Sequence, residues 1–189
     1  MPRVILRDLR WEDFESLTES YWELYDERDR GEPVGVLLFA ERPSAAAEAA
    51  WFSGLYQRTL KGEEIAVVAE TEGQAVGLCQ IRPASVQGPT GEGGHVGELG
   101  ILVHHRHRGQ GVGRAMIERA LELAMPRYEI VRLKVFANNE RAKRLYQELG
   151  FVLCGRLPNA IRRGSTYIDE EEMYIDLRRP DSSGAPTKR

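Results

Sequence analysis

Residues 108 to 114 read Arg-Gly-Gln-Gly-Val-Gly-Arg, a glycine-rich turn between an apolar run and an amphipathic helical pattern. Three glycines at alternate positions leave the backbone uncovered by side chains. The first N–H groups of a helix have no partner within that helix, and the helix dipole places positive charge beside them. Residues 104 to 114 contain no acidic side chain, although the whole chain has a net charge of -3. The sequence therefore predicts a site for an anionic ligand, and a phosphate group suits it.

Two other kinds of phosphate-binding turn also join a strand to a helix, and this segment lacks their defining residues. A dinucleotide fingerprint requires a third glycine three positions after the second, where this chain has Arg114. A nucleotide P-loop requires a lysine followed by serine or threonine, which this turn does not contain. The pattern that remains is Arg-x-x-Gly-x-Gly, formed by Arg108, Gly111 and Gly113.

The length and composition are those of one soluble globular domain. A chain of 189 residues is long enough to close a single core. No stretch approaches the roughly 18 apolar residues of a membrane span, and the first residues lack the apolar core of a signal peptide. The weakly acidic charge argues against a nucleic-acid partner. We expect one domain over residues 1–178, a disordered tail over 179–189, and neither a membrane nor a nucleic acid as partner.

The two cysteines, Cys79 and Cys154, lie in apolar runs far apart in the sequence. Isolated cysteines of this kind are typical of buried thiols in a reducing compartment rather than of a disulfide. We therefore expect both thiols to be buried and the protein to be cytoplasmic.

Hydrophobic periodicity divides the chain into helices and strands. It predicts helices over 11–24, 45–60, 114–124 and 139–149, with Ser44 as the cap of the second. It predicts strands over 3–7, 65–70, 75–82, 96–103, 129–137, 151–155 and 167–177. The strands over 65–70 and 75–82 form a hairpin, and the almost wholly apolar 96–103 is expected to be covered on both faces. Segments 31–39 and 83–95, rich in glycine and proline, predict loops.

Two segments resemble the recurrent motifs of a known family. Residues 97–103, Gly-Glu-Leu-Gly-Ile-Leu-Val, followed by residues 108–114, closely resemble the acetyl-CoA signature of the GNAT superfamily of N-acetyltransferases. Residues 139–151 resemble its other recurrent segment, at the expected distance. The resemblance implies an α/β fold with a mixed (α+β) sheet from about residue 2 to residue 178. That fold has a mostly antiparallel sheet of about seven strands, splayed in the middle and flanked by about four helices.

The resemblance also implies acetyl-CoA as co-substrate, without a metal. The backbone of Ile101, Leu102 and Val103, on the splayed strand, is expected to pair with the pantetheine arm. The pyrophosphate is expected at the turn, whose cofactor-binding residues are Arg108, Gly109, Gln110, Gly111, Val112, Gly113 and Arg114. Asn139 matches the motif's asparagine, which either binds the cofactor or only caps a helix.

Two side chains are candidates for catalysing the attack of an amine on the thioester. The amine must first lose a proton, because an alkyl amine has a pKa near ~10.4. Glu98, an acid within an apolar strand, is either the base that accepts this proton, if burial raises its pKa, or a structural carboxylate paired with an arginine. Tyr146 matches the tyrosine that protonates the leaving thiolate in many relatives, and is otherwise a core residue.

Three histidines, His104, His105 and His107, precede the glycine-rich turn. They have neither the i, i+4 spacing on a helix nor the cysteine partners of a closed zinc site. We interpret them as part of a solvent-exposed loop and expect no metal.

The acceptor side has only weak signals in the sequence. The acidic run over 169–172 either attracts a cationic amine or forms a solvated strand edge. The aromatic residues Tyr21, Trp22 and Tyr25, with the apolar loop over 34–39, are candidates for a wall of the acceptor pocket.

The function that these patterns predict is transfer of an acetyl group from acetyl-CoA to a primary amine of a small molecule or a protein. The acting unit is a monomer or a homodimer. The alternative is a non-catalytic module that binds acyl-CoA as a sensor, which keeps the phosphate-binding turn but needs neither Glu98 nor Tyr146.

Overall fold

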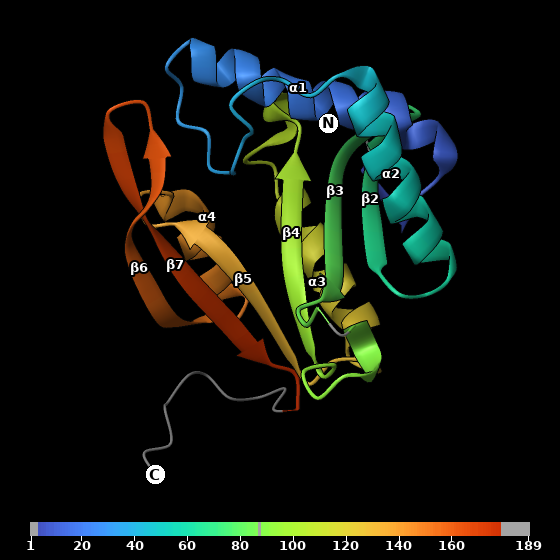
Figure 1. Ribbon diagram of the computed structural model, residues 1–189. Coiled ribbons are helices and arrows are strands. Elements are labelled where there is room, and N and C mark those ends of the chain that lie inside the picture. Colours follow the sequence, from blue (N-terminus) through green and yellow to red (C-terminus); the bar gives the residue numbers. More distant parts are fainter. Residues whose placement is uncertain (1–3, 87, 179–189) are drawn as a thin grey trace.

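The computed structural model describes residues 4–86 and 88–178. Within these residues, seven strands form one sheet with the order β1-β2-β3-β4-β5-β7-β6 (Figure 1). The strands are β1 (Ile5–Asp8), β2 (Ile65–Thr71), β3 (Gln74–Pro83), β4 (Val96–Val103), β5 (Ile130–Phe136), β6 (Val152–Arg163) and β7 (Thr166–Asp176). Neighbouring strands are antiparallel except β4 and β5, which are parallel. The tail predicted over 179–189 lies outside the described residues, and the single domain over 1–178 stays a prediction.

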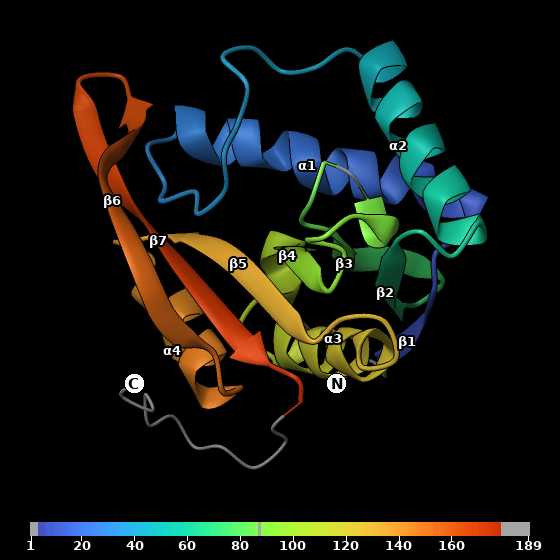
Figure 2. The same ribbon diagram turned by 60° about the horizontal axis from the view of Figure 1, so that its bottom comes forward.

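Four α-helices in the described part of the chain cover the two faces of this sheet. They are α1 (Phe14–Asp29), α2 (Ala45–Leu60), α3 (Val112–Ala124) and α4 (Glu140–Glu148), with short 3-10 turns η1 (Trp11–Asp13), η2 (Gly88–Thr90) and η3 (His105–His107). Helices α1 and α2 lie on one face, and α3 and α4 lie on the other (Figure 2). None of the described helices is both long and apolar enough to cross a membrane. The seven-stranded sheet with helices on both faces confirms the predicted mixed α/β fold.

The sheet is buried on both faces because its central strands present apolar side chains to both helical layers. On β2, Val67 packs in the cluster that contains α3, while Val68 packs in the cluster that contains α2. The side chains of Met116 on α3 and Leu55 on α2 have no exposed surface. Helix α2 has the predicted bounds, and Ser44 fixes its start by accepting a hydrogen bond from the Ala47 N–H at 3.2 Å.

The sheet opens between β4 and β5, as the resemblance implied. The parallel ladder between them contains three pairs in the described residues, and the last joins Glu98 to Arg132. Strand β4 continues to Val103 and stays paired with β3 on its other side. Figure 1 shows β5 diverging from β4 beyond this point. The second half of β4 therefore has one edge whose backbone groups no described strand pairs.

This opening also corrects the prediction that β4 is covered on both faces. Burial alternates at the start of the strand, where Leu99 is buried, but residues 100 to 103 are all partly exposed. The apolar side chains of Ile101, Leu102 and Val103 line a cavity, described below, and are not enclosed on both sides. Apolarity alone does not distinguish these two environments.

The last hairpin differs from its prediction in length, because β6 is twice interrupted. The sequence predicts a strand over 151–155, but β6 runs from Val152 to Arg163 with irregularities after Leu153 and after Leu157. Its residues are mostly exposed because β6 is the edge of the sheet. The burial of Cys154 was wrongly predicted for this reason: its thiol is free and exposed, whereas Cys79 is free and buried.

We predict that Gly97→Ala destabilises the fold whereas Gly155→Ala does not. A Cβ at Gly97 on β4 would lie 2.7 Å from Cγ2 of Ile81 and 3.1 Å from the ring of Tyr128. Overpacking of this kind costs about 1–3 kcal/mol. A Cβ at Gly155 on β6 would meet no atom within 4 Å, so we expect a change within about 0.5 kcal/mol. Urea unfolding measures both, and equal stabilities of the two variants would contradict this account of the sheet.

Candidate active site

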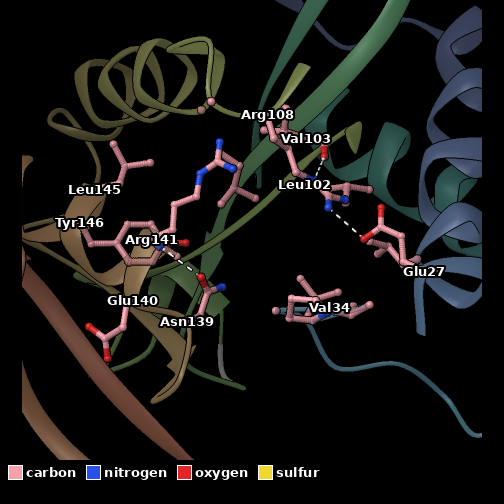
Figure 3. A pocket seen from close by; sticks show the side chains of 18 of the residues that line it. Glu27, Val34, Leu102, Val103, Arg108, Asn139, Glu140, Arg141, Leu145 and Tyr146 are labelled. Atoms are coloured by element: carbon pink, nitrogen blue, oxygen red, sulfur yellow. Dashed lines mark hydrogen bonds and ion pairs between the residues drawn. The ribbon is translucent and has the colours of Figure 1, made fainter. Parts of the chain in front are cut away.

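A cavity of about 760 Å³ opens where β4 and β5 separate. This volume is within the range of sites for small molecules and cofactors. Its lining comes from the end of α1 and the loop after it, the second half of β4, the glycine-rich turn, α4 with the two residues before it, and the end of β6. Figure 3 shows Tyr146, Arg141 and Asn139 on one side of the cavity and Glu27 and Val34 on the other.

Most of the residues that sequence reasoning assigned to the site line this cavity. They are Ile101, Leu102, Val103, Arg108, Gly109, Gly111, Gly113, Arg114, Asn139 and Tyr146. Gln110, Val112 and Glu98 do not line it. Val112 is buried in the core, and Gln110 is exposed and donates a hydrogen bond to the Arg106 carbonyl oxygen at 2.7 Å.

The glycine-rich turn leaves the start of α3 open toward the cavity. Gly109 and Gly111 have φ angles of +80° and +83°, in the left-handed region that favours glycine. The N-cap residue of α3 is Gly111, which has no side chain that could accept a hydrogen bond from the first N–H groups of the helix. The first N–H groups of α3 therefore lack a capping side chain, at the positive end of the helix dipole. This geometry suits a phosphate.

Arg108 is held in place from two sides. Its Nε donates a hydrogen bond to the Val103 carbonyl oxygen at 2.9 Å, and its Nη1 lies 2.9 Å from Oε2 of Glu27 (Figure 3). The Glu27 side chain is only 3% exposed. Its second oxygen, Oε1, is buried and has no hydrogen-bond partner in the described part of the chain. A buried carboxylate oxygen without a partner is costly, so this atom has unused capacity to accept a hydrogen bond.

Arg141 is a site residue that sequence reasoning missed. It lies two positions after Asn139, and its guanidinium extends over the glycine-rich turn: a Cβ built on Gly109 would lie 2.9 Å from Nη2 of Arg141. Arg141 forms no ion pair within the described residues, whereas Arg114 pairs with Glu148. The only signal in the sequence was its place inside the second motif. Arg141 is therefore the arginine most available to an anion at the turn.

Tyr146 lines the cavity from α4, with its aromatic ring packed against Phe151 at a centroid distance of 5.9 Å. The residue is 7% exposed. Burial raises the pKa of the Tyr146 phenol above its usual value, because the charged phenolate is poorly solvated there. The hydroxyl group is therefore protonated at neutral pH.

Glu98 lies outside the cavity, in a row of charges that crosses four strands. Its Oε1 is 2.6 Å from Nη2 of Arg82 on β3, and its Oε2 is 3.1 Å from Nη2 of Arg132 on β5. Arg132 also pairs with Glu172 on β7 at 3.1 Å.

Burial raises the pKa of Glu98, but the two arginines outweigh it and the net pKa is below the usual value. The raised pKa that the base role required is not found. The contacts match the alternative of a structural carboxylate.

Asn139 has the capping role, and it also contacts the loop on the far side of the cavity. Its Oδ1 accepts a hydrogen bond from the Ala142 N–H at 3.2 Å. A Cβ on Gly35 would collide with the Asn139 amide nitrogen, so only glycine permits this approach. Arg163 on β6 fixes the same loop by donating hydrogen bonds to the carbonyl oxygens of Val34 and Val36, at 2.8 and 3.2 Å.

Only some of the residues predicted to form a wall of the acceptor pocket lie at the cavity. Residues 34 to 36 of the predicted loop line the cavity, but Tyr21, Trp22 and Tyr25 do not. Tyr25 is buried, and its hydroxyl oxygen accepts a hydrogen bond from the Phe39 N–H at 3.2 Å. The acidic run over 169–172 is not free to attract an amine, because each member is in an ion pair. The pairs are Asp169 with Arg156, Glu170 with Lys134, Glu171 with Lys143 and Arg156, and Glu172 with Arg132.

Comparison with curated proteins gives acyltransferases that act on amines. The chain is 34% identical over 80 residues to spermidine N(1)-acetyltransferase of Vibrio cholerae, a match that spans 41% of this chain and less than half of that protein, 46%. It is 28% identical over 140 residues to the L-amino acid N-acyltransferase MnaT of Escherichia coli, across 71% of this chain and 77% of the relative.

Solved structures with the same fold include acetyltransferases. The yncA protein of Salmonella typhimurium, solved with acetyl-CoA, has a TM-score of 0.76 at 19% identity and covers 98% of this chain and 99% of its own. A ribosomal-protein-alanine N-acetyltransferase of Brucella melitensis has a TM-score of 0.76 at 23% identity, over 91% and 99% of the two chains. The model of the acetyltransferase (GNAT) family matches residues 3–151. Because this match covers most of the chain, the protein belongs to the GNAT family of acetyltransferases.

Proposed function

We propose that this protein transfers an acetyl group from acetyl-CoA to a primary amine by direct attack of the amine on the thioester. The observation that carries the proposal is the continuity of one cavity along the unpaired edge of β4 and the uncapped start of α3. An amide-bearing arm ending in a pyrophosphate matches these two surfaces in that order. The family membership and the acetyl-CoA bound in yncA support the same assignment.

In this proposal the cofactor is held mainly by the backbone. The pyrophosphate accepts hydrogen bonds from the N–H groups at the start of α3, around Gly111 and Gly113, and Arg141 supplies the charge above them. The pantetheine amides pair with the β4 backbone around residues 101 to 103. Arg108 contributes indirectly, because its two contacts link the end of β4 to α1.

The proposed reaction uses Tyr146 as the proton donor. The nitrogen of the neutral amine attacks the thioester carbon, the C–S bond breaks, the sulfur leaves as a thiolate, and the nitrogen of the new amide gives its extra proton to water. Tyr146, whose phenol is protonated at neutral pH, protonates the sulfur and regains a proton from water. Glu98 takes no part in this scheme, since it lies outside the cavity and is paired with arginines.

We propose Glu27 as the residue that receives the amine. It is a buried carboxylate on the wall opposite Tyr146, and Oε1 has no partner among the described residues. An ammonium group placed there would satisfy this oxygen and gain a charge-assisted hydrogen bond. Arg108 holds the other oxygen, so the carboxylate is fixed in orientation. The acceptor class that fits is a cationic primary amine.

Release of free thiol from acetyl-CoA tests both the reaction and the role of Tyr146. A panel of spermidine, L-amino acids and peptides with a free N-terminus is mixed with the wild-type protein, and we expect turnover with at least one of them. Tyr146→Phe should lower kcat by about 100-fold or more and leave the KM for acetyl-CoA unchanged, because only the proton donor is lost. Tyr128→Phe is the matched control, since Tyr128 is a buried tyrosine outside the cavity.

Two results would contradict this account. Binding of CoA without turnover of any amine would favour the alternative, a non-catalytic sensor. Equal kcat values for wild type and Tyr146→Phe would exclude the tyrosine as the acid while leaving the transferase intact.

We predict that Gly109→Ala weakens CoA binding and that Gly73→Ala does not. Both glycines have a φ of +80°, so alanine costs each variant about 1–2 kcal/mol of stability. A Cβ at Gly73, in the β2–β3 turn, meets no atom within 4 Å, whereas one at Gly109 displaces the Arg141 guanidinium. Calorimetry should give about a tenfold rise in the Kd for CoA in Gly109→Ala alone. The same Kd in both variants would show that the turn and Arg141 do not hold the cofactor.

A further inference from the structure

A carboxylate from α1 lies between two of the three histidines that precede the glycine-rich turn. Oε2 of Glu23 is 3.0 Å from Nε2 of His104 and 2.9 Å from Nδ1 of His105. The three ligand atoms all lie within 4.8 Å of one another. The histidines alone did not predict a metal site, because they have neither the i, i+4 spacing on a helix nor cysteine partners. The fold supplies that ligand from a residue about 80 positions earlier in the chain.

The position of this cluster follows from how α1 crosses the end of β4. Glu23 and Glu27 are four residues apart on α1 and therefore share one face of the helix. Glu27 holds Arg108, and one helical turn earlier Glu23 meets His104 and His105. The segment between β4 and the glycine-rich turn is thus attached to α1 at two points.

We propose that Glu23, His104 and His105 bind a divalent zinc ion. Two imidazoles and one carboxylate are ligands that zinc accepts, and water completes a tetrahedral site of this open kind. Zinc bonds of 2.0–2.2 Å place neighbouring ligand atoms roughly 3.3 Å apart. The two separations from Glu23, 3.0 and 2.9 Å, are close to this spacing, and the two imidazole nitrogens lie within 4.8 Å of each other.

Binding of a cation would also change one contact of His104. In the metal-free protein, Nδ1 of His104 accepts a hydrogen bond from the Arg106 N–H at 3.3 Å. Ligation of a metal by Nε2 would leave the ring proton on Nδ1, so this hydrogen bond would be lost. A bond of this length is weak, so its loss is small beside two new bonds to the metal.

Calorimetric titration of Zn²⁺ into the metal-free, full-length protein tests this site without any use of CoA. We expect one ion per chain, and at least about a tenfold weaker Kd in His104→Ala, in His105→Ala and in Glu23→Gln. His95→Ala is the matched control, because His95 is an exposed histidine outside the cluster, and it should bind zinc as the wild type does. Zinc should raise the Tm of the wild type and of His95→Ala, but not that of His104→Ala.

The melting temperature of each metal-free variant checks that it is folded before zinc is added. Unchanged zinc affinity in both His104→Ala and Glu23→Gln would overturn the proposal, as would the absence of zinc binding by the wild type. Loss of binding in Cys154→Ser, which removes the exposed thiol, would assign the ion to a different site and would overturn it equally.

Discussion

The last pair of the β4–β5 ladder, Glu98 opposite Arg132, is the point on which the site depends. Their side chains form an ion pair at the position where the two strands begin to separate. Arg82 extends this charge row to β3, and Glu172 extends it to β7. Charged side chains on adjacent strands stabilise the pairing of those strands. These contacts match one of the two alternatives for Glu98, a structural carboxylate paired with arginines, at the closed end of the opening in the sheet.

The separation of β4 and β5 explains why a cofactor cavity forms here. Beyond Glu98, the backbone of β4 is paired with β3 on one edge only, and the chain then turns through glycines into α3. Two sets of unsatisfied backbone groups are thus joined in one cavity, which is suited to a ligand with amides at one end and phosphates at the other. Side chains from α1 and α4 close its two sides.

Features that depend on neighbouring residues in the chain could be predicted from the sequence. The glycine-rich turn, the β2–β3 hairpin and the bounds of α2 follow from local patterns, and the place of Tyr146 at the cavity follows from the resemblance to the GNAT family. Contacts between distant segments could not be predicted. Glu27 meets Arg108 across 81 residues, and Arg163 reaches Val34 across 129. A lone glutamate or arginine on a polar helix face or an edge strand carries no sign of its partner, so these residues became visible only in the fold.

The central claim is that backbone N–H groups of the glycine-rich turn and the open edge of β4 hold the cofactor. Hydrogen exchange with and without acetyl-CoA, followed by mass spectrometry of peptides, measures those groups directly. We expect slower exchange in peptides covering residues 101–103 and 109–114, with no change in the hairpin over residues 65–83. Unchanged exchange at residues 109–114 under saturating acetyl-CoA, or slowing confined to other segments, would contradict it.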